Sequence, residues 1–166
     1  MSLYHVSVPS MKRSLTALSN ILKKAEAHAE ANNIDPAVLI NSRLYPDMFP
    51  LKRQVQIASD SARRGPGQLA GVEVPSMADT EETFAELQDR IQKTIDFLDT
   101  LNESQFEGAE TKTIELPTPN GPIKMDGTSF LMGFAMANFS FHVVTAYNIL
   151  RHNGVKIGKM DYLGAA

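Results

Sequence analysis

The stretch GTSFLMGFAMANFSFHVVTAYNIL, from Gly127 to Leu150, contains no Asp, Glu, Lys or Arg. Its length would suffice to cross a bilayer, but polar side chains recur within it and the rest of the chain is amphipathic. A helix that is apolar around nearly its whole circumference is typical of the buried helix of a bundle. We therefore predict a central helix over residues 129–152, with Phe134, Phe141 and Val144 in the core.

Three other segments repeat apolar residues at steps of three or four, which is the period of one helix face. They predict helices over residues 10–31, 51–63 and 80–101. The Gly65-Pro66-Gly67 sequence is expected to end the second of these helices, and the alternative is that helix resumes from Gln68 to Gly71. Asp79 to Glu82 has the pattern of a capping box, in which two side chains cap the first backbone amides, and we expect it to start the third.

The same patterns predict the environment of individual side chains. Leu98 lies on the apolar stripe of the third helix and is assigned to the core, whereas Arg90 lies on the opposite, outer face. Arg63 and Arg64 are assigned to a solvated helix end, where cations interact favourably with the helix dipole, and an anion site is the less favoured alternative for this pair.

Residues 111–125 predict a small β-hairpin before the last helix. Thr111 to Leu116 alternates as a half-buried strand does, and the turn sequence from Pro117 to Pro122 reverses the chain. With four long amphipathic segments, the pattern predicts an all-α fold, a four-helix bundle with this hairpin inserted, over a single domain of residues 1–166.

Composition excludes several classes of function. The chain of 166 residues has a formal charge of −3 and no Cys. The absence of Cys excludes disulfides and thiolate metal sites, and the lack of a basic surplus argues against nucleic acid as a partner. The first residues lack the cationic start and apolar core of a signal peptide. We therefore expect a cytoplasmic protein with no membrane partner.

His142 is the most informative of the four histidines, since it lies in the charge-free helix. It shares one helix face with Asn138 and Thr145, and on the second helix Gln56 and Asp60 are four residues apart. These five residues are the candidates for a small-ligand pocket between the two helices. Two interpretations stay open for His142: a core histidine hydrogen-bonded to a neighbouring helix, or a pocket residue that acts as ligand or as acid and base.

Two stretches resemble a known superfamily. FHVVTAYNILRHNGVKIGKMDYLG (Phe141 to Gly164) resembles the last helix and tail of the DinB/YfiT-like bundles, and LYPDMFPLKRQVQIASDSA (Leu44 to Ala62) is similar to an uncharacterised subfamily of that group. The resemblance implies a four-helix bundle, usually up-down-down-up. It also implies, for many members, a divalent metal held by three histidines, and for some a thiol-dependent transferase or isomerase activity.

Carried over by position, the resemblance places one metal-binding histidine on His142, a second on Asn138 and the third at or near Gln56. Amides bind transition metals much more weakly than imidazole does, so we expect no metal and no other cofactor. The favoured hypothesis is a ligand-binding or degenerate-site bundle. The alternatives are a transferase-like enzyme and a self-associating structural protein, and whether the chain is an enzyme stays open.

A homodimer is a further expectation. The last helix is apolar almost all round, yet three other long helices are available to cover it. The tail from Ile157 to Leu163 is one possible cover. Where the tail does not reach, a second subunit is expected to, because a large exposed apolar stripe is unusual in a monomer.

Overall fold

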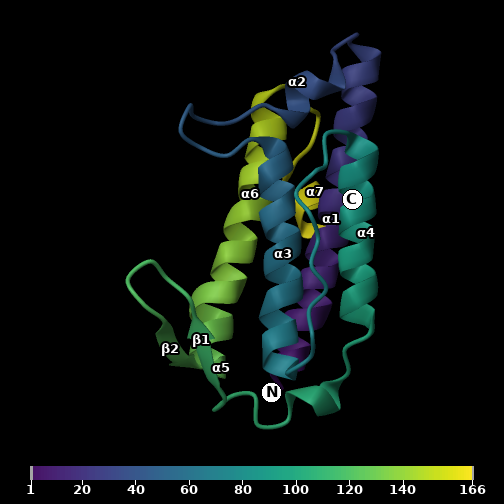
Figure 1. The fold of residues 1–166 in the computed structure, drawn as a ribbon. Helices are drawn as coiled ribbons and strands as arrows, with labels where there is room; N and C mark the ends of the chain where they lie inside the picture. Colours follow the sequence, from purple (N-terminus) through teal and green to yellow (C-terminus); the bar gives the residue numbers. More distant parts are fainter. Residues whose placement is uncertain (1, 166) are drawn as a thin grey trace.

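The computed structural model describes residues 2–165 and confirms the all-α four-helix bundle with its hairpin. The bundle consists of α1 (Leu3–Ala31), α3 (Leu51–Ala70), α4 (Phe84–Asp99) and α6 (Met136–His152). In Figure 1, α1 rises from the N-terminus, α3 descends, α4 also descends and α6 rises. The up-down-down-up order requires a long connection between the parallel helices α3 and α4.

This connection is an extended segment over residues 72–82, which we call the strap. It runs along α3 and α4 from the lower end of the bundle to the upper end (Figure 1). A capping box formed by Thr83 and Glu86 then begins α4. The capping box predicted from Asp79 to Glu82 is therefore wrong, because Asp79 and Glu81 are in the strap and pair with arginines instead.

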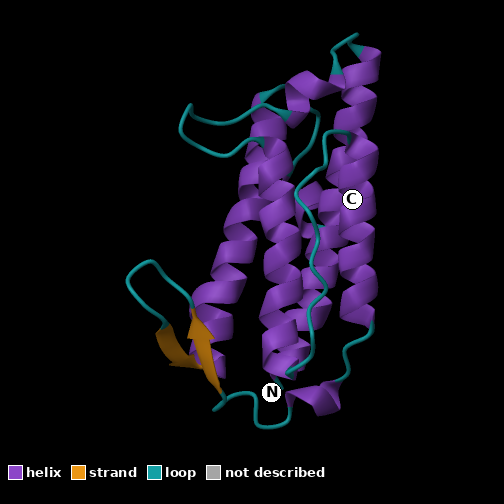
Figure 2. Cartoon of the chain, viewed as in Figure 1, coloured by secondary structure: helices purple, strands orange, loops and turns teal. Residues whose placement is uncertain are grey.

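Short elements complete the fold, and Figure 2 distinguishes the helices from the two strands. The predicted hairpin is present and antiparallel, and its register places Thr113 opposite Asp126 and Leu116 opposite Ile123. The elements are α2 (Pro36–Ile40), the 3-10 helix η1 (Glu103–Phe106), β1 (Thr113–Leu116), β2 (Ile123–Asp126), α5 (Gly127–Ser129), the π-helical segment η2 (Phe130–Ala135) and α7 (Lys159–Leu163).

Two helices extend beyond their predicted ends, each through a proline. α1 begins at Leu3, seven residues before the predicted start, and includes Pro9. Burial of Leu3 and Val8 in the core offsets the hydrogen bond that the proline removes. The hydrophobic contacts of the first turns thus outweigh the tendency of proline to interrupt a helix.

α3 continues through Gly65, Pro66 and Gly67 to Ala70, so the predicted end at this sequence is wrong. All three residues are buried, and a Cβ atom on Gly65 would lie 3.1 Å from the Cβ of Ala135 on the neighbouring helical segment. The glycine allows the two backbones to approach closely. The helix ends at Gly71, whose φ of 68° is the left-handed conformation that favours glycine.

The face that α6 buries differs from the predicted one. Leu98 on α4 is fully buried, as predicted, but Phe134, Phe141 and Val144 are 45, 56 and 37% exposed. α6 packs mainly on α3 and less on α1, whereas α4 lies on the far side of these two helices. With two neighbours α6 buries one side, on which Phe139 lies, and its other side faces outward.

The C-terminal tail does not cover that outward side. α7 packs against α1, where Lys24 pairs with Asp161. The Tyr162 ring contacts Tyr147 edge-on at 6.2 Å. By length and composition alone, the helical stretch Gly127–His152 would also be long and apolar enough to cross a membrane, but here it forms one wall of the bundle.

Gly127 joins the hairpin to the last helical stretch and provides a test of this packing. An added Cβ would lie 1.9 Å from the carbonyl oxygen of Ala109, which is backbone and has no flexible end to move. We expect Gly127→Ala to lower the free energy of unfolding by about 1–3 kcal/mol.

Gly133→Ala is the matched control in the same helical stretch. Its Cβ would meet nothing within 4 Å, so the variant should be neutral or more stable by up to about 1 kcal/mol. Urea denaturation of both variants measures the difference. Equal stability of the two variants would show that the junction is not packed as described.

Candidate functional site

Side chains of α3 and α6 form two polar pairs across the helix interface. His142 Nδ1 lies 2.7 Å from Gln54 Oε1, and both side chains are buried. One turn earlier on α6, Asn138 Nδ2 donates a 2.7 Å hydrogen bond to Ser61 Oγ. Because the helices run antiparallel, earlier positions on α6 face later positions on α3. The prediction that His142 and Asn138 face the second long helix is confirmed.

The hydrogen bonds of Gln54 determine which nitrogen of His142 carries the proton. Gln54 Nε2 donates to the carbonyl of Phe49 at 2.9 Å, so its Oε1 must be the acceptor toward His142. His142 Nδ1 is then the donor, and Nε2 keeps a lone pair without a hydrogen-bond partner among residues 2–165. Burial, and secondarily the charge of Arg53, lower the pKa of His142, so the imidazole is neutral at pH 7.

The other predicted partners lie elsewhere. Gln56 donates to Glu81 in the strap at 2.9 Å, and Asp60 binds arginines rather than facing His142. Thr145 donates its hydroxyl proton to the carbonyl of Phe141 within the helix. Gln54 and Ser61, which the sequence interpretation missed, occupy the positions across the gap. Gln54 and Ser61 are seven residues, or two helical turns, apart. This spacing is the sequence feature that would have placed both side chains on the same face of the second long helix.

A groove of about 470 Å³ lies beside the pair formed by Asn138 and Ser61, between α3, η2, α6 and the end of β1. Asn138 and Ser61 line it, and so does Asp60. Its apolar wall includes Phe130 and Phe134, and Arg53 and Arg64 are its cationic residues. Of the five predicted pocket residues, the structure therefore brings Asn138 and Asp60 to one groove, and leaves His142 and Thr145 further along α6.

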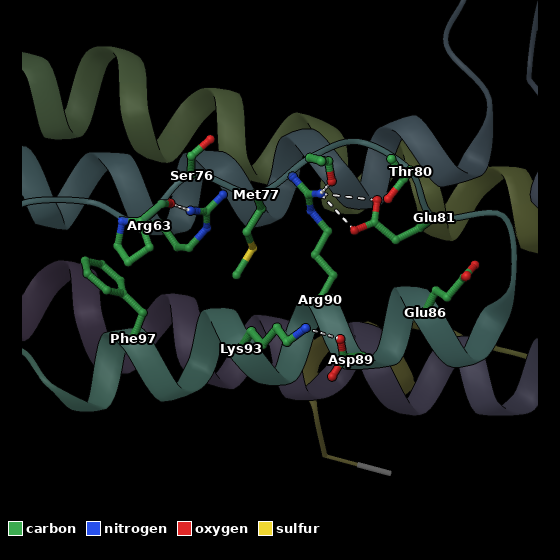
Figure 3. A pocket seen from close by; sticks show the side chains of 12 residues that line it. Arg63, Ser76, Met77, Thr80, Glu81, Glu86, Asp89, Arg90, Lys93 and Phe97 are labelled. Atoms are coloured by element: carbon green, nitrogen blue, oxygen red, sulfur yellow. Dashed lines mark hydrogen bonds and ion pairs between the residues drawn. The ribbon is translucent and has the colours of Figure 1, made fainter.

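Two buried arginines hold the strap against α3 and α4, as Figure 3 shows. The side chains of Arg63 and Arg90 are each 1% exposed, so the predicted surface positions of both are wrong. Arg90 binds Asp60 at 2.8 Å and Glu81 at 2.9 Å. Exposure of Arg64 was predicted correctly, since its side chain is 66% exposed.

Backbone carbonyls of the strap complete this network. Arg63 donates to the carbonyl of Pro75, and Arg90 donates to that of Ala78 at 2.9 Å. A pocket of about 550 Å³ lies between the strap and α4, with Met77 and Phe97 in its wall (Figure 3). Carboxylates and carbonyls of the chain already bind the terminal nitrogens of both guanidinium groups, whereas the buried Nε atoms of Arg63 and Arg90 have no hydrogen-bond partner among residues 2–165. Because carboxylates pair both charges, this pocket offers a ligand little unpaired charge. Its arginines act as structural links between the strap and the helices.

The donor set does not fit a three-histidine metal centre. Within residues 2–165 there is no group of three or more His, Cys, Asp or Glu side chains placed to hold a metal ion. In the described part of the chain His142 is the one imidazole at the α3–α6 interface, and the amide of Asn138 uses its nitrogen to bind Ser61. Amide groups are in any case poor ligands for zinc and nickel.

The environment of His142 predicts a pH dependence of stability. Because its pKa is lowered on folding, the unfolded chain binds this proton more readily than the folded chain. The contribution to stability is complete above the ordinary pKa of about 6.5. It is lost as the pH falls through the lower pKa of the folded state.

His142→Gln should therefore show a smaller loss of unfolding free energy between pH 7.5 and the acid range than the unchanged protein. Denaturant titrations at several pH values measure this difference, and groups that titrate in both proteins cancel. An imidazole that titrates by NMR at or above its ordinary pKa would contradict the prediction.

Comparisons with known proteins identify relatives along nearly the whole chain. The model of a family described as "Domain of unknown function (DUF1993)" matches residues 3–163. A crystal structure of a DinB family member protein from Shewanella denitrificans superposes with a TM-score of 0.94 at 44% sequence identity. That match covers 99% of this chain and 93% of the other. No curated protein matches the chain.

Proposed function

Because this chain belongs to the DUF1993 family and has the fold of a DinB family member, we propose that it is a cytoplasmic small-molecule-binding bundle that works without a resident metal ion. Its binding site is the groove between α3 and α6. The observation that carries the proposal is the charge of this groove, in which exposed arginine stands next to an apolar wall.

The groove has a surplus of positive charge. Arg64 is 66% exposed, and its Nη2 lies 3.5 Å from Asp60, beyond a strong hydrogen bond. Asp60 is already neutralised by the buried Arg63 and Arg90. Arg53 adds a second, half-exposed cation at the groove, paired with Asp79. An anionic ligand would therefore replace the loose contact of Arg64 with a charge-assisted hydrogen bond.

The apolar wall and the amide define the rest of the ligand. Phe134 is 45% exposed and Phe130 lies behind it, with ring centroids 6.2 Å apart. This wall favours an aromatic or aliphatic body, and Asn138 offers a carbonyl oxygen that accepts hydrogen bonds. The class of ligand that fits is a small carboxylate with an apolar body. Such clefts with few polar groups are common ligand sites.

Ligand-observed NMR with phenylacetate, and with phenylacetamide as its uncharged match, tests the proposal. We expect the carboxylate to bind and the amide to bind at least several-fold more weakly. Arg64→Gln should weaken carboxylate binding about tenfold, since a hydrogen bond to a charged group contributes about 1.5–3 kcal/mol.

Lys93→Gln is the matched control, because Lys93 is an exposed cation on α4, outside the groove. It should leave binding unchanged. Equal binding of the acid and the amide, or equal loss in both variants, would refute a carboxylate site.

The proposal that the protein works without a resident metal ion is tested separately by elemental analysis of protein purified without a His tag. One equivalent of zinc, nickel or iron that is lost in His142→Ala would overturn it.

His142 favours a second candidate, a transferase-like enzyme. Its neutral imidazole has a free Nε2 lone pair, and Gln54 holds the ring by Nδ1. A histidine oriented in this way can act as a general base. If the protein is such an enzyme, His142→Gln should abolish turnover of a bound substrate and leave its binding intact, whereas a pure binding protein would show no turnover to lose.

A further inference from the structure

The outward side of α6 has the spacing of a helix–helix seam. The exposed residues of this side, which begins at Phe134 in η2 and continues along α6, follow one another at alternating steps of three and four: Phe134, Ala137, Phe141, Val144 and Asn148. We call these five residues the seam. Steps of three and four are the pattern by which one helix packs lengthwise against another. Within residues 2–165 no helix of the bundle packs on this side, because α3 and α1 pack on the opposite side of α6.

The seam lacks charge over its whole length. The sequence from Gly127 to Leu150 contains no acidic or basic residue, and Phe134, Phe141 and Val144 leave large apolar areas in contact with solvent. Contiguous apolar surface of this kind marks an interaction site. A neutral helix face is its natural partner, since a charged one would lose its hydration with no opposite charge to replace it.

We propose that the partner is a second copy of this chain, with the two α6 helices antiparallel. The two-fold axis passes the seam at the height of residue 139, midway between Ala137 and Phe141. In that arrangement positions equally far from 139 face each other. Phe134 of one copy then faces Val144 of the other, and Ala137 faces Phe141. Each large ring of these two pairs is opposite a smaller side chain, so the seam from Phe134 to Val144 is complementary to itself, as a two-fold interface requires. Asn148 lies beyond this part, because the equivalent position on the partner is the buried Phe130.

The ends of α6 are complementary in charge under the same symmetry. Arg151 and His152 lie at its C-terminal end, and both are exposed. Asp126 precedes the helical stretch at its other end and is also exposed. The two-fold axis places Asp126 of one copy beside His152 and Arg151 of the other. A parallel pair would instead bring the two Arg151 side chains together, which charge repulsion disfavours.

Exposed apolar residues at the two ends of the molecule would add to the same antiparallel interface. The loop before α3 and the hairpin project on the side of α6 at opposite ends of the bundle (Figure 1). The loop exposes Tyr45 and Phe49, at 65 and 54%, and the hairpin exposes Ile123, at 52%. An antiparallel pair brings the loop of one copy toward the hairpin of the other. Phe134 also lines the ligand groove, so the second copy would border that groove.

Sedimentation equilibrium gives the first test. We expect a species of twice the 18.2 kDa chain mass at high micromolar concentration. Phe141→Glu should produce a monomer with an unchanged circular dichroism spectrum, because the Phe141 side chain is already more than half exposed. Met160→Glu, at a residue that is 54% exposed on α7, is the control and should stay dimeric. A monomeric unchanged protein, or a dimeric Phe141→Glu, would overturn the proposal.

The absence of cysteine allows a direct test of the register. Ala137→Cys and Phe141→Cys are prepared separately and oxidised alone or as a mixture. In the antiparallel pair residue 137 faces residue 141 of the other copy, so the mixture should form a covalent dimer, and each variant alone should not. Covalent dimers from each variant alone, with none specific to the mixture, would show a parallel pair and refute the arrangement. Both results are read by non-reducing electrophoresis and do not depend on any ligand.

Discussion

Phe139→Ala is expected to lower the free energy of unfolding by about 3–5 kcal/mol. The Phe139 side chain is 2% exposed and is part of the hydrophobic core. Its removal takes away a large apolar contact area and leaves a cavity that rigid helices cannot collapse to fill. The loss would be a large fraction of the stability of an ordinary domain, which is about 5–15 kcal/mol.

Phe141→Ala is the matched control, since it changes the same residue type two positions away. Phe141 is 56% exposed, so its truncation should change the stability of the monomer by much less, within about 1 kcal/mol. Denaturant titrations followed by circular dichroism at the lowest workable protein concentration keep self-association from contributing. A larger effect at Phe141 than at Phe139 would mean that α6 presents the opposite face to the bundle.

Arg90→Met should also be strongly destabilising, by about 3–5 kcal/mol. Arg90 is 1% exposed, and its guanidinium binds Asp60, Asp79 and Glu81. Removing one partner of a buried ion network leaves the remaining charges without compensation. The strap should then separate from α3 and α4, because Arg90 also holds the carbonyl of Ala78.

Lys93→Met is the matched control for this prediction. Lys93 lies one turn after Arg90 on α4, but its side chain is 61% exposed and pairs with the equally exposed Asp89. The control should leave the unfolding transition where it is. Limited proteolysis adds a specific readout, since cleavage within residues 72–82 should accelerate in Arg90→Met alone. Similar effects of the two substitutions would show that the arginine network does not hold the strap.

Local sequence patterns determined the elements of this protein. The apolar stripe of α4 correctly placed Leu98 in the core, and the alternation and turn residues between 111 and 125 located the hairpin. These features depend on periodicity, and a periodic pattern needs no knowledge of neighbours. For the same reason His142 and Asn138 could be assigned to one face of the last helix before any partner was known.

Tertiary structure decided which face of α6 is buried and which polar residues meet. A helix that is apolar all round gives no sign of its inward side, so the sequence assigns Phe134 and Phe141 to the core. Within residues 2–165, however, α6 packs on two of the three other bundle helices, and both rings face outward. The partners of His142 depend on the offset between antiparallel helices, which brings Gln54 rather than Gln56 within 2.7 Å. Arg63 and Arg90 are buried because the strap, an extended segment between their two helices, crosses over them and accepts a hydrogen bond from each. Burial and pairing arise from contacts between separate elements of the chain, and local periodicity does not encode those contacts.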